Sequence, residues 1–104
     1  MGNIFEYTLP ELDNENFYTQ LTCKNVAIKT IVSNTLTTPQ TFMQECDEWV
    51  VVLQGCAKIE MDAVVYKLKK GDTLFIPAHT QHTVLKTKQI VVWLAVYIYE
   101  EKMK

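Results

Sequence analysis

The sequence contains no arginine: all ten of its basic residues are lysines, and the formal net charge at pH 7 is −2. Arginine is the side chain that proteins use most for bidentate contacts with phosphates and base edges. No run of basic residues makes up for its absence. The sequence therefore argues against a nucleic acid as the partner.

Long apolar runs are also missing, so no segment predicts a membrane span. The N-terminal residues lack the charged start and the apolar block of a signal peptide. The cysteines, Cys23, Cys46 and Cys56, are odd in number and have no CxxC spacing, which favours reduced thiols over a disulfide framework. These absences predict a soluble cytoplasmic protein with no membrane partner.

With 104 residues, the chain has the length of one domain, residues 1–104. From Asn25 onward, short segments rich in β-branched residues alternate with turns that contain glycine or proline. Short strands at this spacing, with no strong helical pattern after residue 22, predict an all-β sandwich or barrel. Gly55 separates EWVVVLQ from CAKIEMD and is expected to close a tight hairpin between them.

Residues 1–22 are expected to form an N-terminal arm outside the barrel. The arm could contain a brief helix capped by Asp13 or Asn14, with Phe17 and Leu21 on one face. An extended arm is the alternative, because so short a helix has little stability of its own.

The strand that begins near Glu48 is apolar on both faces. Since side chains alternate along a strand, Val50 and Val52 point inward if Glu48 does. The opposite face then carries Trp49, Val51 and Leu53. A row of this kind is normally covered, so we expect the N-terminal arm, a second copy of the chain in a homodimer, or both, to pack on it.

Glu48 itself is a single acid on an otherwise apolar inner face. Such a carboxylate is costly unless it is paired, protonated or bound to a metal. Glu48 is therefore a candidate metal ligand or catalytic acid–base group at the mouth of a pocket. The alternative is a partly solvated strand-end residue partnered by a lysine or a backbone donor.

Two spaced motifs resemble those of the cupin family. The first is Glu48, six residues and Gly55; the second is Gly71, five residues, Pro77 and, after AHTQ, His82. The chain is similar to small single-domain bacterial cupins over about residues 26–99. This resemblance implies an antiparallel jelly-roll β-barrel whose lumen holds a pocket, often with a divalent metal.

The chain departs from the family's usual metal ligands. Phe42 and Gln44 stand where the first motif usually has two histidines, and His79 and Lys86 fill a usual glycine and a usual asparagine of the second motif. The ligand set that the resemblance implies here is Gln44, Glu48, His79 and His82. Such a set suits zinc, manganese or iron(II), and a thiolate from Cys46 would favour zinc. A metal-free pocket that binds a small organic ligand directly is the alternative.

The sequence does not determine where several side chains near these motifs lie. Trp93, Tyr97 and Tyr99 share one face of the last strand and either wall the pocket or belong to the core or an interface. Lys86 lies at an even spacing from His82 and either enters the barrel or stays solvated at its rim.

The preferred hypothesis is a cupin whose lumen binds a divalent metal and a small polar metabolite. Its activity would be that of a metal-assisted isomerase, lyase or oxygenase-like enzyme. The alternative is a non-catalytic module that binds or senses a small molecule through a degenerate metal site. A scaffold that acts only through its outer face ranks third.

Overall fold

The computed structural model describes residues 2–100, and the secondary structure of this part consists of β-strands. The strands are β1 (Asn14–Cys23), β2 (Val26–Asn34), β3 (Gln40–Phe42), β4 (Asp47–Gln54), β5 (Cys56–Met61), β6 (Val64–Lys69), β7 (Thr73–Ile76), β8 (His82–Val84) and β9 (Ile90–Ile98). Within residues 2–100, no helix is long and apolar enough to span a membrane.

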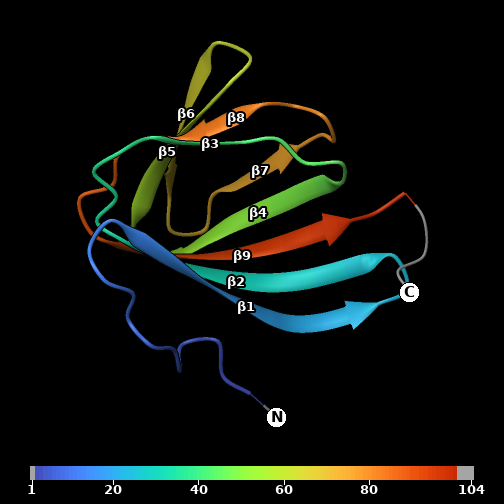
Figure 1. The fold of residues 1–104 in the computed structure, drawn as a ribbon, viewed down its shortest axis with the longest axis horizontal. Helices are drawn as coiled ribbons and strands as arrows, with labels where there is room; N and C mark the ends of the chain where they lie inside the picture. Colours follow the sequence, from blue (N-terminus) through green and yellow to red (C-terminus); the bar gives the residue numbers. More distant parts are fainter. Residues whose placement is uncertain (1, 101–104) are drawn as a thin grey trace.

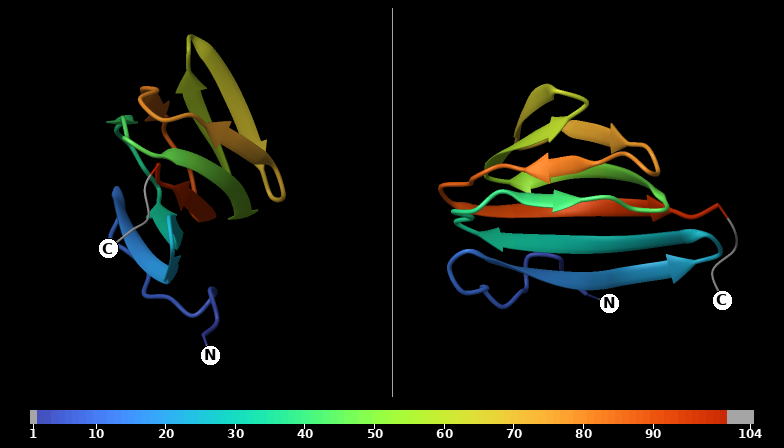
Figure 2. Two further views of the ribbon diagram at one scale, coloured as in Figure 1. Left: turned by 90° about the vertical axis from the view of Figure 1, so that its right-hand side faces the viewer. Right: turned by 45° about the horizontal axis from the view of Figure 1, so that its top comes forward.

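The strands form two antiparallel sheets that face each other (Figures 1 and 2). The larger has five strands in the order β1-β2-β9-β4-β7, and the smaller has four in the order β3-β8-β5-β6. Strands that are neighbours in space are mostly distant in sequence, as in a jelly roll. The predicted all-β jelly-roll barrel is confirmed.

The core lies between the sheets and is built from inward side chains of both. β4 follows the predicted alternation: Glu48, Val50 and Val52 are buried, whereas Trp49 is 37% exposed. β5 alternates in the same way, with Ala57, Ile59 and Met61 buried and their neighbours exposed. Period-two burial of this kind is what a strand with one face on a core requires.

Of the two alternatives for the N-terminal residues, the brief helix is not found in residues 2–22, because residues 14–23 form strand β1. This strand pairs with β2 from Asn14↔Asn34 to Cys23↔Val26. Phe17 and Leu21, whose spacing of four suggested a helical face, belong to a segment rich in aromatic and threonine residues that favours a strand. The large sheet thus starts earlier than the predicted barrel, and only the residues before β1 form an arm.

Gly55 has a positive φ of 81°, but the hairpin expected there is also wrong. β4 belongs to the large sheet and β5 to the small one, so Gly55 lies where the chain crosses between sheets. A Cβ at this position would lie 2.4 Å from the carbonyl oxygen of Ile90. Only glycine satisfies both the backbone angle and this close approach.

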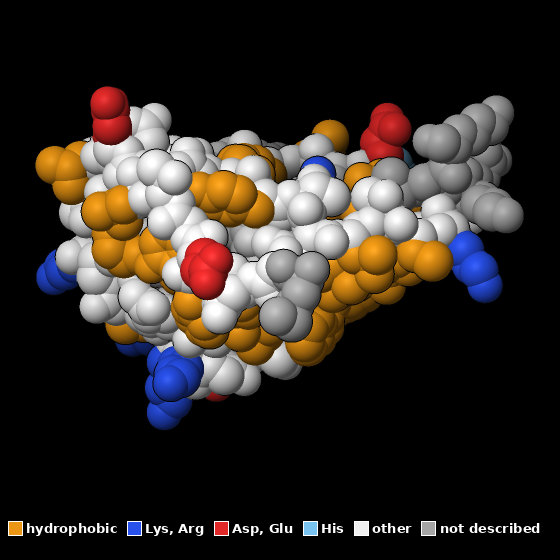
Figure 3. Space-filling view, turned by 90° about the horizontal axis from the view of Figure 1, so that it is seen from below, with side chains coloured by type: hydrophobic (Ala, Val, Ile, Leu, Met, Phe, Trp, Pro, Cys, Tyr) orange, Lys and Arg blue, Asp and Glu red, His pale blue; other side chains and the backbone are white. Residues whose placement is uncertain are grey.

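The N-terminal arm does not cover the outer face of β4. Its polar contacts include β1 and β2: the Asn16 amide and the Tyr18 hydroxyl donate to the carbonyl oxygen of Thr8, and the Asn34 amide donates to that of Pro10. Trp49 and its cross-strand neighbour Phe75 remain exposed. Hydrophobic side chains also gather on the side of the molecule that carries the arm and β1 (Figure 3).

Candidate functional site

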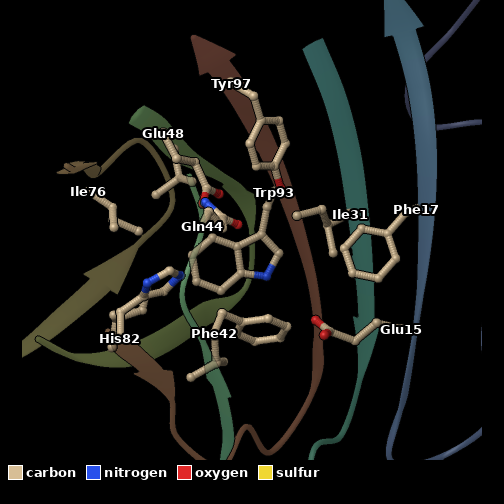
Figure 4. Close-up of a pocket in the computed structure, with 13 residues that line it drawn as sticks. Glu15, Phe17, Ile31, Phe42, Gln44, Glu48, Ile76, His82, Trp93 and Tyr97 are labelled. Atoms are coloured by element: carbon tan, nitrogen blue, oxygen red, sulfur yellow. The ribbon is translucent and has the colours of Figure 1, made fainter. Parts of the chain in front are cut away.

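A pocket opens between the two sheets and has a volume of about 70 Å³. Its walls are mostly aliphatic and aromatic, and its polar side chains are Glu15, Gln44, Glu48, His82 and Tyr97 (Figure 4). Phe17 lines it and is 54% exposed, which places the opening beside β1. The lining suits a molecule with a polar group, and the volume limits that molecule to a few heavy atoms.

Glu48 projects into this pocket from β4 and is 5% exposed. The Nε2 amide of Gln44 donates a hydrogen bond of 2.7 Å to its Oε1 oxygen. Burial raises the pKa of the Glu48 carboxyl, although hydrogen bonds from Gln44 and Tyr97 and the nearby His82 oppose this effect. Glu48 is thus a carboxyl group whose ionisation has become more costly.

His82 begins β8 and is 4% exposed. Its Nδ1 lies 3.1 Å from the carbonyl oxygen of Thr80, a contact in which the ring nitrogen donates. In the neutral form of the ring, Nε2 is then the acceptor, and the ring lies on the same side of the pocket as Gln44 and Glu48 (Figure 4). Phe42, the cross-strand neighbour of His82, stacks on it with ring centroids 5.9 Å apart.

Of the predicted site residues, the structure brings Gln44, Glu48 and His82 together in this pocket. His79 lies outside it: the residue is exposed and its φ is 61°. The backbone N–H of His79 donates to the carbonyl oxygen of Gln44 at 2.7 Å. His79 therefore supports the backbone next to the site and supplies no side chain to it.

The other candidates divide between core, pocket and rim. Cys46 is buried in the core, and burial, followed by the charge of Glu48, raises the pKa of its thiol. Trp93 and Tyr97 line the pocket, whereas Tyr99 packs beside the core. Lys86 is exposed, as expected for a residue at the rim.

Glu15 is a pocket residue that sequence reasoning missed. It comes from β1, accepts a hydrogen bond from the Ser33 hydroxyl, and has a carboxyl pKa that burial raises. It was missed because residues 1–22 were expected to form an arm. The alternation of Glu15 and Phe17 toward one face, read as a strand, could have found it.

The pocket side chains do not make a good set of ligands for a divalent metal. Among residues 2–100, no group of three or more histidine, cysteine, aspartate or glutamate residues is placed to hold one ion. Phe42 packs against His82, and Gln44 directs its amide N–H toward Glu48. A metal would need an oxygen or an imidazole at these places.

The comparisons with known proteins place the chain in a family. The sequence profile of the cupin domain matches residues 31–97. A candidate mannose-6-phosphate isomerase from Ralstonia eutropha JMP134 is 33% identical, with a TM-score of 0.80 over 95% of this chain and 97% of that one. The chain belongs to the cupin family.

Other solved structures share the fold at lower identity. A cupin superfamily protein from Desulfitobacterium hafniense DCB-2 is 19% identical, with a TM-score of 0.74 over 89% of this chain and 84% of that one. A conserved protein of unknown function from Streptococcus pyogenes is also 19% identical, with a TM-score of 0.79 over 97% and 88%. No curated protein sequence matches the chain significantly.

Proposed function

We propose that this cupin binds a small organic molecule in its lumen directly, without a resident metal. The observation that carries the proposal is the contact between Gln44 and Glu48 inside an apolar pocket. The contact fixes a buried carboxyl group at the inner end of the pocket, where it can orient a ligand by a hydrogen bond. The function is therefore the non-catalytic binding or sensing alternative of the sequence analysis.

The pocket does not suit a sugar phosphate, the substrate class that the name of the Ralstonia protein contains. Proteins bind the phosphate group of a sugar phosphate most strongly with arginine or lysine side chains. The pocket lining contains no lysine, and the chain has no arginine. The acidic pocket instead favours a ligand without a phosphate.

A metal analysis combined with thermal unfolding in EDTA tests the proposal. We expect protein purified without chelator to contain far less than one metal ion per chain, and its melting temperature to be unchanged by EDTA. A small molecule that binds the lumen should raise the melting temperature in EDTA. At a hundred times its Kd, it should add about 2.7 kcal/mol to the free energy of unfolding. Stoichiometric metal, lost together with ligand binding on chelation, would overturn the proposal.

Acid–base catalysis is the second candidate function. The observation in its favour is that one pocket holds a carboxyl with a raised pKa and a histidine with an acceptor nitrogen. Glu48 would then exchange a proton with the substrate. Turnover that Glu48→Gln abolishes while ligand binding persists would establish this role.

We also propose that a second copy of the chain covers the outer face of the large sheet. Three adjacent strands present exposed apolar side chains on this face: Phe75 on β7, Trp49 on β4 and Ile98 on β9. Light scattering on the intact protein should give the mass of a homodimer, and Trp49→Lys should give that of a monomer. A monomeric wild-type protein would contradict this.

The free thiols of Cys23, Cys46 and Cys56 support a cytoplasmic location.

A further inference from the structure

The pocket is acidic, although the chain as a whole is nearly neutral. Two carboxyl groups line it: Glu48 from β4 and Glu15 from β1. No lysine lines it, and five lysines instead surround a separate groove beside β5 and β6: Lys58, Lys67, Lys69, Lys86 and Lys88. A charged ligand that enters the lumen therefore meets two carboxyl groups and no lysine.

Aromatic rings form much of the remaining wall. Trp93 lies at the centre of the pocket, Glu15 lies between the rings of Phe42 and Phe17, and Tyr97 lies near Glu48 (Figure 4). The faces of aromatic rings attract cations, and tryptophan does so most strongly. Carboxylates combined with aromatic faces are a known environment for an ammonium group.

We propose that the lumenal pocket selects small aliphatic amines, which carry an ammonium group on a short apolar body, over alcohols and carboxylates of the same shape. The inference rests on the proposed function, because it names the class of ligand that the metal-free pocket takes. The apolar body contacts Trp93 and the aliphatic wall. The ammonium group pairs with Glu48 or Glu15, whereas a carboxylate in the same position is repelled by both.

Several polar side chains surround Glu48, but none of them is a lysine. Gln44, His82 and Tyr97 face the carboxyl in the pocket, and Cys46 lies close to it in the core. Lys29 has its Nζ 5.2 Å from the centre of the Tyr97 ring and is not among the residues that line the pocket, so no lysine competes with an ammonium ligand inside the lumen.

Trp93 provides a direct readout, since Trp49 is the chain's second tryptophan and lies on the outer face. In the Trp49→Phe protein, all tryptophan fluorescence comes from the pocket. Isobutylamine, isobutanol and isovalerate have the same branched body and differ in their head group. At about pH 8, where ordinary imidazole side chains are neutral, we expect isobutylamine to bind at least about tenfold more tightly than the other two probes.

Replacement of either glutamate should reduce this preference, since Glu15→Gln and Glu48→Gln each remove one charge at nearly constant shape. Glu60→Gln removes the same charge from the exposed side of β5 and should leave the preference unchanged. Isobutanol or isovalerate binding as tightly as isobutylamine would overturn this inference while leaving a ligand-binding lumen intact. Absence of binding by all three probes would overturn the proposed function and the inference together.

Discussion

The side-chain amide of Gln44 donates a 2.7 Å hydrogen bond to the buried carboxyl of Glu48. The family's first motif usually carries a histidine at position 44, so this contact replaces a metal-directed group by one directed at the glutamate. It also separates two interpretations of the pocket. A metal site needs Glu48 as a free anionic ligand, whereas a direct ligand-binding site can use a carboxyl that the protein itself already holds in place.

Gln44→Leu should destabilise the protein. The substitution removes the donor to a buried carboxyl, and an unsatisfied buried group of this kind costs about 1–3 kcal/mol. The loss should appear as a reduced free energy of unfolding in urea at neutral pH. Gln81→Leu, at an exposed position just before β8, is the control and should change stability little. Equal effects of the two substitutions would show that the contact is not stabilising.

Glu48 should make the folded protein less stable as the pH rises. Burial raises the pKa of Glu48 above its ordinary value of 4.5, and it raises the pKa of Glu15 as well. Between the unfolded and folded pKa values the native state binds more protons, so stability is highest below the unfolded pKa and falls as pH rises through the folded one. Urea unfolding across this range should show Glu48→Gln losing less stability than the wild type as the pH increases. Parallel curves for the two proteins would contradict the raised pKa.

Gly55→Ala should be much more harmful than Gly71→Ala, although both glycines have positive φ values, 81° and 91°. At Gly71 an added Cβ meets no atom within 4 Å, so the substitution carries only the backbone cost of about 1–2 kcal/mol. At Gly55 the Cβ also collides with the carbonyl oxygen of Ile90 on β9. In thermal unfolding, we expect Gly55→Ala to lose at least about 1–2 kcal/mol more stability than Gly71→Ala.

The sequence predicts those parts of the site that depend on strand periodicity. Glu48, Val50 and Val52 face inward because alternation along a strand fixes their side, and the spacing of the motifs brought Glu48 and His82 to one pocket. The alternation could not tell which sheet the next strand joins. Gly55 was therefore interpreted as a hairpin residue, although the chain crosses there to the opposite sheet.

Other parts of the site depend on tertiary contacts that local patterns do not contain. Glu15 enters the pocket only because β1 pairs with β2, and an isolated segment with Phe17 and Leu21 four residues apart is equally compatible with a helical turn. His79 matched the type of residue that a metal site needs. Its left-handed backbone conformation, at a place where the family usually has glycine, leaves its side chain outside the pocket.

Restoring the family's two histidines should create a metal site in the lumenal pocket. The double substitution Phe42→His, Gln44→His would add two imidazoles to Glu48 and His82, and it would remove both the ring stacked on His82 and the amide that donates to Glu48. Three histidines and one carboxylate form a set that suits zinc, manganese or iron(II). We expect the double variant to retain close to one metal ion per chain after dialysis, measured by elemental analysis, while the wild type retains almost none. Adding His82→Ala to the double variant should abolish the gain in metal content. Equal metal content in the wild type and the double variant would show that Phe42 and Gln44 do not prevent metal binding in the pocket.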